Sequence, residues 1–164
     1  MGRAWVAGLA LLVVLGGCRD TGSEGELFKI SGKLVVFNYR LAVASYVVTL
    51  EPLQPMREGE AAVASFENPA GGPALAARQR IWPRLGKVTL ESPPLRCVRK
   101  DRPYAVSIRI EDTEGVVRQE IATVLVSSED QSRMPERPLV VGPAYESSDG
   151  LPAQSAEPPP PCPP

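Results

Sequence analysis

Apolar and polar residues alternate along much of the middle of the chain. The clearest case is residues 104–111, where four large apolar side chains alternate with Ala, Ser, Arg and Glu. Successive side chains of a β-strand point to opposite faces, so this pattern predicts a strand with one buried face. Turn-forming residues at 112–115 and a β-branched run at 116–126 come next. Together the two runs predict an antiparallel hairpin.

Other segments extend this pattern on both sides of the hairpin. Three of them are also strand-like, namely residues 27–37, 45–53 and 87–91. Two alanine-rich segments, 58–67 and 74–82, fit either a strand or a short helical turn. Residues 138–142 could form a short closing strand, and their proline favours an edge or a strand-start position. About seven short strands separated by turn residues predict an all-β fold, a small antiparallel β-sandwich.

The first 17 residues have the composition of an export signal. Arg3 gives a positive start, residues 5–15 are apolar, and small residues follow. The apolar run is shorter than the roughly 20 residues that a membrane-spanning helix needs. Residues 15–18, Leu-Gly-Gly-Cys, resemble the bacterial lipobox. We therefore expect residues 1–17 to be a cleaved lipoprotein signal peptide.

The lipobox resemblance implies that Cys18 is the lipidation site. In that family the cysteine sulfur receives a diacylglycerol, the chain is cut before the cysteine, and the new amino group is acylated. Arg19 stands where an aspartate would resemble an inner-membrane retention signal, so the resemblance favours the outer membrane, with the domain facing the periplasm. The alternatives are an ordinary signal peptide with a chance cysteine, or a buried amphipathic N-terminus.

Composition divides the rest of the chain into three parts. Residues 18–26 are polar and form a flexible tether by their composition. Residues 27–145 hold the strand-like segments and are the expected β-sandwich domain. Residues 146–164 are rich in Pro and Ser and are expected to be a disordered tail. The prolines of that tail could alternatively be a ligand for a partner domain.

The residues that most enzymes need are missing from this sequence. The chain has 164 residues, a formal net charge of −1 and no histidine. Histidine is the commonest general base and transition-metal ligand. We find no phosphate-binding glycine loop, no nucleophile elbow and no cysteine pair at zinc spacing. The sequence therefore predicts no enzyme activity, no cofactor and no metal, and the near-zero charge predicts no nucleic-acid partner.

Two cysteines besides Cys18 could pair. An oxidising compartment permits a disulfide between Cys97 and Cys162, but sequence alone does not bring the two within bonding distance. The alternative is a half-buried Cys97 with a free Cys162 in a mobile tail.

One aromatic residue and two charged runs are candidate contact sites. Trp82 lies between Arg80 and Arg84, and this composition resembles that of binding hot spots. These three residues are the candidate partner-binding site, although a core tryptophan that caps one end of the sandwich is the commoner role. The basic run at 96–102 could dock an acidic peptide or anionic headgroups, or be a charged loop. The carboxylates at 111–114 are expected to be solvated turn residues.

The order of these segments resembles a known group of lipoproteins. The matching segments are residues 30–34 (ISGKL), 44–53, 102–111 (RPYAVSIRIE) and 114–126. They resemble the pilotins, or chaperones, of type III secretion secretins and related small outer-membrane lipoproteins. The resemblance implies a non-enzymatic role, in which the lipoprotein binds a tail segment of a secretin subunit and assists its assembly in the outer membrane. The alternatives are a general envelope lipoprotein with a structural or adhesive role, and an envelope enzyme or carbohydrate-handling protein.

Overall fold

The fold of the described residues is nearly all β. The computed structural model describes residues 25–149 and 161–163, so the predicted signal peptide, Cys18 and most of the Pro-rich tail lie outside the described residues. The strands in this part are β1 (Phe28–Asn38), β2 (Val43–Pro52), β3 (Ala61–Phe66), β4 (Leu75–Arg80), β5 (Val88–Glu91), β6 (Pro103–Glu111), β7 (Val117–Val126), β8 (Val140–Val141) and β9 (Glu146–Ser147). Two short 3-10 helices, η1 (Pro83–Leu85) and η2 (Gln131–Arg133), lie between them.

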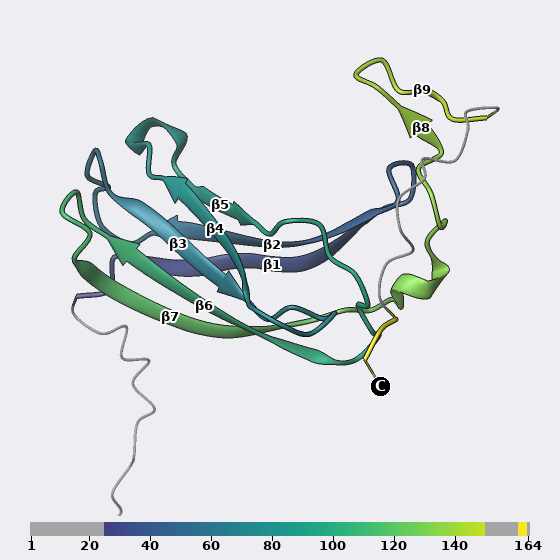
Figure 1. Cartoon of the computed structure of the whole chain (residues 1–164). Coiled ribbons are helices and arrows are strands. Elements are labelled where there is room, and N and C mark those ends of the chain that lie inside the picture. The colour runs from purple at the N-terminus through teal and green to yellow at the C-terminus, as the bar shows by residue number, and fades with distance from the viewer. Residues whose placement is uncertain (1–24, 150–160, 164) are drawn as a thin grey trace, which may run out of the picture.

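Seven of these strands form two antiparallel sheets that pack face to face (Figure 1). One sheet has the order β1-β2-β5 and the other has the order β4-β3-β6-β7. This arrangement confirms the predicted antiparallel β-sandwich, including the hairpin of β6 and β7. The two alanine-rich segments are both strands, β3 and β4, which pair with each other.

The predicted closing strand at residues 138–142 does not join the sandwich. Its β8 pairs with β9 in a separate small hairpin. This hairpin is attached to the turn between β1 and β2, where the Leu139 N–H donates to the Arg40 carbonyl oxygen at 2.8 Å. A two-residue strand followed by a turn at Gly142, where φ is +70°, folds back on itself instead of pairing with a sheet edge.

Alternation along the strands fills the space between the two sheets. β2 and β6 turn every second side chain inward, and these side chains are almost completely buried. Tyr46 of β2 lies at the centre of this core, with its ring 5.8 Å from that of Phe66 and 5.6 Å from that of Tyr104. The small Ala62 and Ala64 of β3 are buried in the same core, in register with the larger Ile110 and Ile108 of β6.

Two tyrosine hydroxyls in this core differ in their partners and predict opposite effects of substitution. The Tyr104 hydroxyl accepts the backbone N–H of Arg99 at 2.7 Å. The Tyr46 hydroxyl is buried without a hydrogen-bond partner among the described residues, and burial raises its pKa. A buried polar group without a partner costs roughly 1–3 kcal/mol. We expect Tyr46→Phe to raise the free energy of unfolding by about 1 kcal/mol and Tyr104→Phe to lower it by about 1–2 kcal/mol.

Urea denaturation monitored by circular dichroism measures both variants under the same conditions. Both substitutions remove one oxygen atom and keep the ring, so each is the control for the other. Equal destabilisation by the two would contradict the different hydrogen bonding of the hydroxyls.

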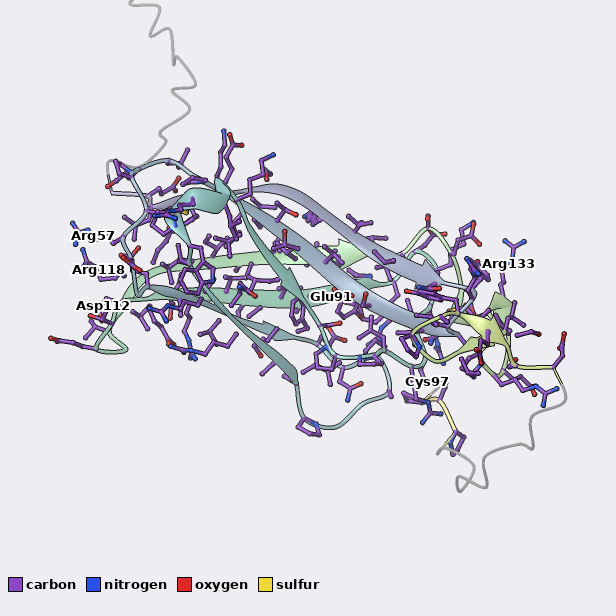
Figure 2. All side chains as sticks on the ribbon, turned by 90° about the horizontal axis from the view of Figure 1, so that it is seen from above. Arg57, Glu91, Cys97, Asp112, Arg118 and Arg133 are labelled. Carbon is purple, nitrogen blue, oxygen red and sulfur yellow. A yellow bond between two sulfur atoms is a disulfide. The ribbon has the colours of Figure 1, made fainter. Side chains whose placement is uncertain are left out.

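The strand directions gather the loops at two ends of the sandwich. Ile30, Leu50 and Val88 are paired across β1, β2 and β5, so the starts of β1 and β5 lie at one end. We call this the N-terminal end; it also carries the turn between β6 and β7 (Figure 1). The opposite end carries Cys97, far from Arg57, Asp112 and Arg118 (Figure 2). We call it the disulfide end.

Candidate functional site

The outer strands of the two sheets, β1 and β7, lie along one side of the sandwich and meet in a seam. At the N-terminal end the seam is closed by the side-chain amide of Gln119 on β7. Its Oε1 accepts the backbone N–H groups of Leu27 and Phe28 at 3.0 and 2.9 Å, and its Nε2 donates to the Phe28 carbonyl at 2.8 Å. Further along, Lys33 Nζ donates to Thr123 Oγ1 at 2.7 Å. In this half of the seam, hydrogen bonds from side chains take the place of the backbone hydrogen bonds that join paired strands.

The remaining half of β1, residues 34–37, is an open edge. In the described part of the chain no hydrogen bond joins these four residues to β7. Leu34 is 50% exposed, and on the β7 side Val124 and Val126 are 47% and 52% exposed. An edge strand presents unpaired backbone groups, and proteins usually protect them with charges and bulges. The first half of β1 has both, with Lys33 and a register shift between Ile30 and Gly32, whereas residues 34–37 have neither.

Trp82 is exposed and lies against Arg80. Ile81 is completely buried, whereas Trp82 is 42% exposed. The Arg80 guanidinium carbon lies 4.6 Å from the Trp82 ring centroid, a cation–π arrangement. Arg84 is exposed in η1, immediately after Trp82. The expectation of a core tryptophan is therefore wrong, while binding of a partner by Trp82, Arg80 and Arg84 stays a prediction.

The period-two alternation of β4 continues past its end and explains this exposure. Ile81 takes the inward position, so Trp82 falls on the same outward face as Arg78 and Arg80. The sequence contained this signal, because two arginines and the tryptophan recur at every second position from residue 78. A tryptophan in register with two arginines indicates the outer face of a half-buried strand.

Cys97 and Cys162 are joined by a disulfide, with their Cα atoms 5.4 Å apart. The alternative with a free Cys162 is therefore wrong. The Arg99 side chain also donates to the Pro163 carbonyl. Residues 146–147 form β9, so two pieces of the stretch expected to be a disordered tail are attached to the domain. A hollow of about 960 Å³ lies beside the disulfide.

The acidic residues at 111–114 are not simply solvated turn residues. Glu111 is buried, and its carboxylate lies 2.6 Å from Arg78 and 3.5 Å from Arg109. These two arginines lie on β4 and β6, on either side of β3, and both are in register with Val63. Asp112 accepts the backbone N–H groups of Glu114 and Val116 at 3.0 and 2.9 Å, which builds the turn. Both carboxylates therefore serve the fold.

The basic run at residues 96–102 lies at the disulfide end and is partly used by the structure. The Arg102 guanidinium donates to Glu67 at 2.8 Å and lies over the Tyr104 ring at 4.7 Å. Arg99 is bound to the end of the chain at Pro163. These contacts support the interpretation of this run as a charged loop.

No group of three or more His, Cys, Asp or Glu residues in the described part of the chain is placed to hold a metal ion. Over the same residues, no helix has the length and apolarity to cross a bilayer. Comparison of the sequence with protein-family models and with curated proteins gives no match. Among the described residues, the open edge of β1 and the surface around Trp82 both expose large apolar side chains.

Proposed function

We propose that this chain is a lipid-anchored, non-enzymatic protein of the bacterial outer membrane that binds an extended segment of another envelope protein. Cys18 is the anchor, and the β-sandwich faces the periplasm. The observation that carries the proposal is the open edge of β1 at residues 34–37, where apolar side chains border unpaired backbone. Strand addition to such an edge is a common mode of peptide recognition.

The two halves of β1 have different roles in this proposal. A partner strand along residues 34–37 would obtain backbone hydrogen bonds from the edge and would place alternate side chains beside the outward Leu34 and Val36. Lys33 reaches across the seam to Thr123, and the Gln119 amide occupies the backbone groups of Phe28. The added strand therefore ends at Lys33, which fixes its position along β1.

In its more specific form, the proposal is that this chain is a pilotin. The partner is then a tail segment of a secretin subunit, which the lipid anchor brings to the outer membrane. The resemblance of residues 30–34, 44–53, 102–111 and 114–126 to secretin pilotins supports this choice. A short tail segment also suits an edge that is only four residues long.

A pull-down from detergent-solubilised outer membranes with the acylated protein tests this function. We expect the wild type to recover a secretin subunit. The amount recovered by the double variant Leu34→Lys/Val36→Lys should be at least tenfold lower. Charged residues on an exposed edge oppose strand addition, and Leu34 is already half exposed, so the fold tolerates the change. Cys18→Ser should leave the secretin away from the outer membrane in cells.

The matched control is Val116→Lys/Val117→Lys, which adds the same two charges at exposed aliphatic positions of the N-terminal end. It should recover the partner as the wild type does. Recovery of no envelope protein by the correctly anchored wild type would refute the proposal. Equal loss in both double variants would refute the assignment to the open edge.

A further inference from the structure

The connection between β4 and β5 carries an exposed surface that the edge of β1 does not account for. We infer that this surface, which we call the Trp82 surface, lies against the phospholipid headgroups beside the lipid anchor. It consists of Arg80, Trp82, Arg84, Leu85 and Lys87. The inference rests on the proposed anchoring through Cys18 and assigns the orientation of the domain on the membrane.

The composition of the Trp82 surface is that of a membrane interface. No Asp or Glu occurs between Glu67 and Glu91, whereas this stretch contains three arginines and one lysine, in a chain whose net charge is −1. Trp82 is 42% exposed and Leu85 is 67% exposed. Tryptophan and basic residues with apolar stems favour the headgroup level of a bilayer. Cations near anionic lipids add electrostatic attraction.

The surface also lies at the end of the domain that an anchor would bring to the membrane. Val88, at the start of β5, is in register with Leu50 and Ile30, so the starts of β5 and β1 are two strand spacings, about 10 Å, apart. The seven residue-to-residue steps from Cys18 to Gly25 can extend over at most about 25 Å. The N-terminal end therefore stays within reach of the bilayer, while the open edge at residues 34–37 lies further along the sandwich (Figure 1).

The exposure of Trp82 is imposed by the backbone around it. The Ile81 N–H donates to the Glu60 carbonyl at 2.9 Å, and the Ile81 side chain is buried in the core. The Leu85 N–H donates to the Trp82 carbonyl at 3.0 Å, and Gly86 ends the turn with φ at +69°. This frame holds Trp82 and Leu85 outward at little further cost in conformational entropy when they meet a surface.

The acidic side chains of the N-terminal end are held by other groups or lie on other loops. Glu111 is in register with Arg80 across Ala61 of β3, but its carboxylate lies 2.6 Å from Arg78 and 3.5 Å from Arg109. Asp112 lies 4.0 Å from Arg118 in the turn between β6 and β7, and Glu58 is in the loop between β2 and β3. In the described part of the chain, no ion pair involves Arg80, Arg84 or Lys87. An anionic bilayer should tilt the domain so that the connection between β4 and β5 is nearest to the lipids.

The fluorescence of Trp82 tests the inference directly. The sequence has two tryptophans, Trp5 and Trp82, and Trp5 belongs to the segment that signal cleavage removes. The acylated mature protein is incorporated into vesicles of phosphatidylcholine and phosphatidylglycerol, with and without acyl chains brominated near the headgroup. We expect Trp82 emission to shift to shorter wavelength on incorporation and to lose roughly half of its intensity with brominated lipid. Trp82 that stays accessible to aqueous iodide and unquenched by bromine in vesicle-bound protein overturns the inference.

Charge variants show whether the cations contribute. Arg80→Gln/Arg84→Gln/Lys87→Gln should lose most of the bromine quenching on anionic vesicles. The control Lys100→Gln/Arg133→Gln/Arg137→Gln removes three exposed cations of the disulfide end and should behave as the wild type does. Equal quenching in both triple variants would contradict the role of the basic residues. Shielding of Trp82 only after a partner protein is added would assign the surface to that protein and refute the lipid contact.

Flotation of the vesicles separates failure of the anchor from failure of the surface. If the acylated chain does not float with the lipid, the proposed anchoring is wrong. The same spectra are then recorded for Cys18→Ser with an N-terminal histidine tag held by a nickel-chelating lipid. Quenching in that form supports the surface independently of acylation, and its absence refutes it.

Discussion

Replacing Cys162 with serine is expected to lower the free energy of unfolding by about 2–4 kcal/mol. The bond to Cys97 closes a loop with a sequence separation of 65 residues, and this loop contains β6 and β7. A cross-link over such a length removes many conformations from the unfolded chain, and the chain-entropy estimate for this loop is about 4 kcal/mol. Denaturation in urea without reductant measures the change, and the melting temperature should fall by about 10 °C.

The control for this prediction is the comparison of three variants. Cys97→Ser, Cys162→Ser and the double variant should unfold alike, because each lacks the same bond. In strong reductant the wild type should have the same free energy of unfolding as the variants. Adding reductant to the variants should not change their free energy of unfolding. Additive losses in the double variant would contradict the prediction, since they would mean that each cysteine contributes by its own packing.

The strands of the sandwich could be predicted where alternation is regular. Residues 104–111 alternate large apolar and polar side chains, and β6 has this pattern of burial. The alanine-rich β3 was ambiguous, because alanine is a strong helix former and is depleted in strands. Its Ala62 and Ala64 are buried in register with Ile110 and Ile108 of β6, which lie more than 40 residues away in the sequence. Local propensity carries no information about such neighbours.

The candidate surfaces depend on tertiary contacts to different degrees. The exposure of Trp82 follows from its alternation with Arg78 and Arg80, which is a local pattern that can be recognised in the sequence. The seam between β1 and β7 could not be predicted from the local sequence. Gln119 and Phe28 are 91 residues apart, and neither residue type indicates the other. The disulfide was permitted but not decided by sequence, since only the fold brings Cys97 and Cys162 together. Glu111 was expected to be solvated, and its burial depends on arginines from two strands.

The seam links the stability of the domain to its proposed function. Addition of a partner strand requires that the edge of residues 34–37 facing away from β2 stays free of hydrogen bonds. The sandwich, in contrast, requires that its two sheets stay together at their outer strands, β1 and β7. Gln119 and Lys33 hold the two sheets together through their side chains and leave the edge at residues 34–37 free. β1 begins at Phe28, so under the proposed lipid anchoring the same contact would also hold the start of β1 against a force on the N-terminus.

Gln119→Ala is therefore expected to destabilise the domain by about 2–3 kcal/mol, more than an ordinary half-exposed polar substitution. It removes three hydrogen bonds and leaves the N–H groups of Leu27 and Phe28 and the Phe28 carbonyl without their partner, in a partly buried place. Urea denaturation measures the loss, and hydrogen exchange should show faster exchange at the start of β1 than in β2. Gln119→Glu keeps the two accepted bonds but turns a carboxylate oxygen toward the Phe28 carbonyl oxygen in place of the donor, so at neutral pH it should destabilise the domain as well. The control is Glu120→Ala, at an exposed position of β7 outside the seam. A loss from Gln119→Ala no larger than that of this control would show that the amide does not hold the seam.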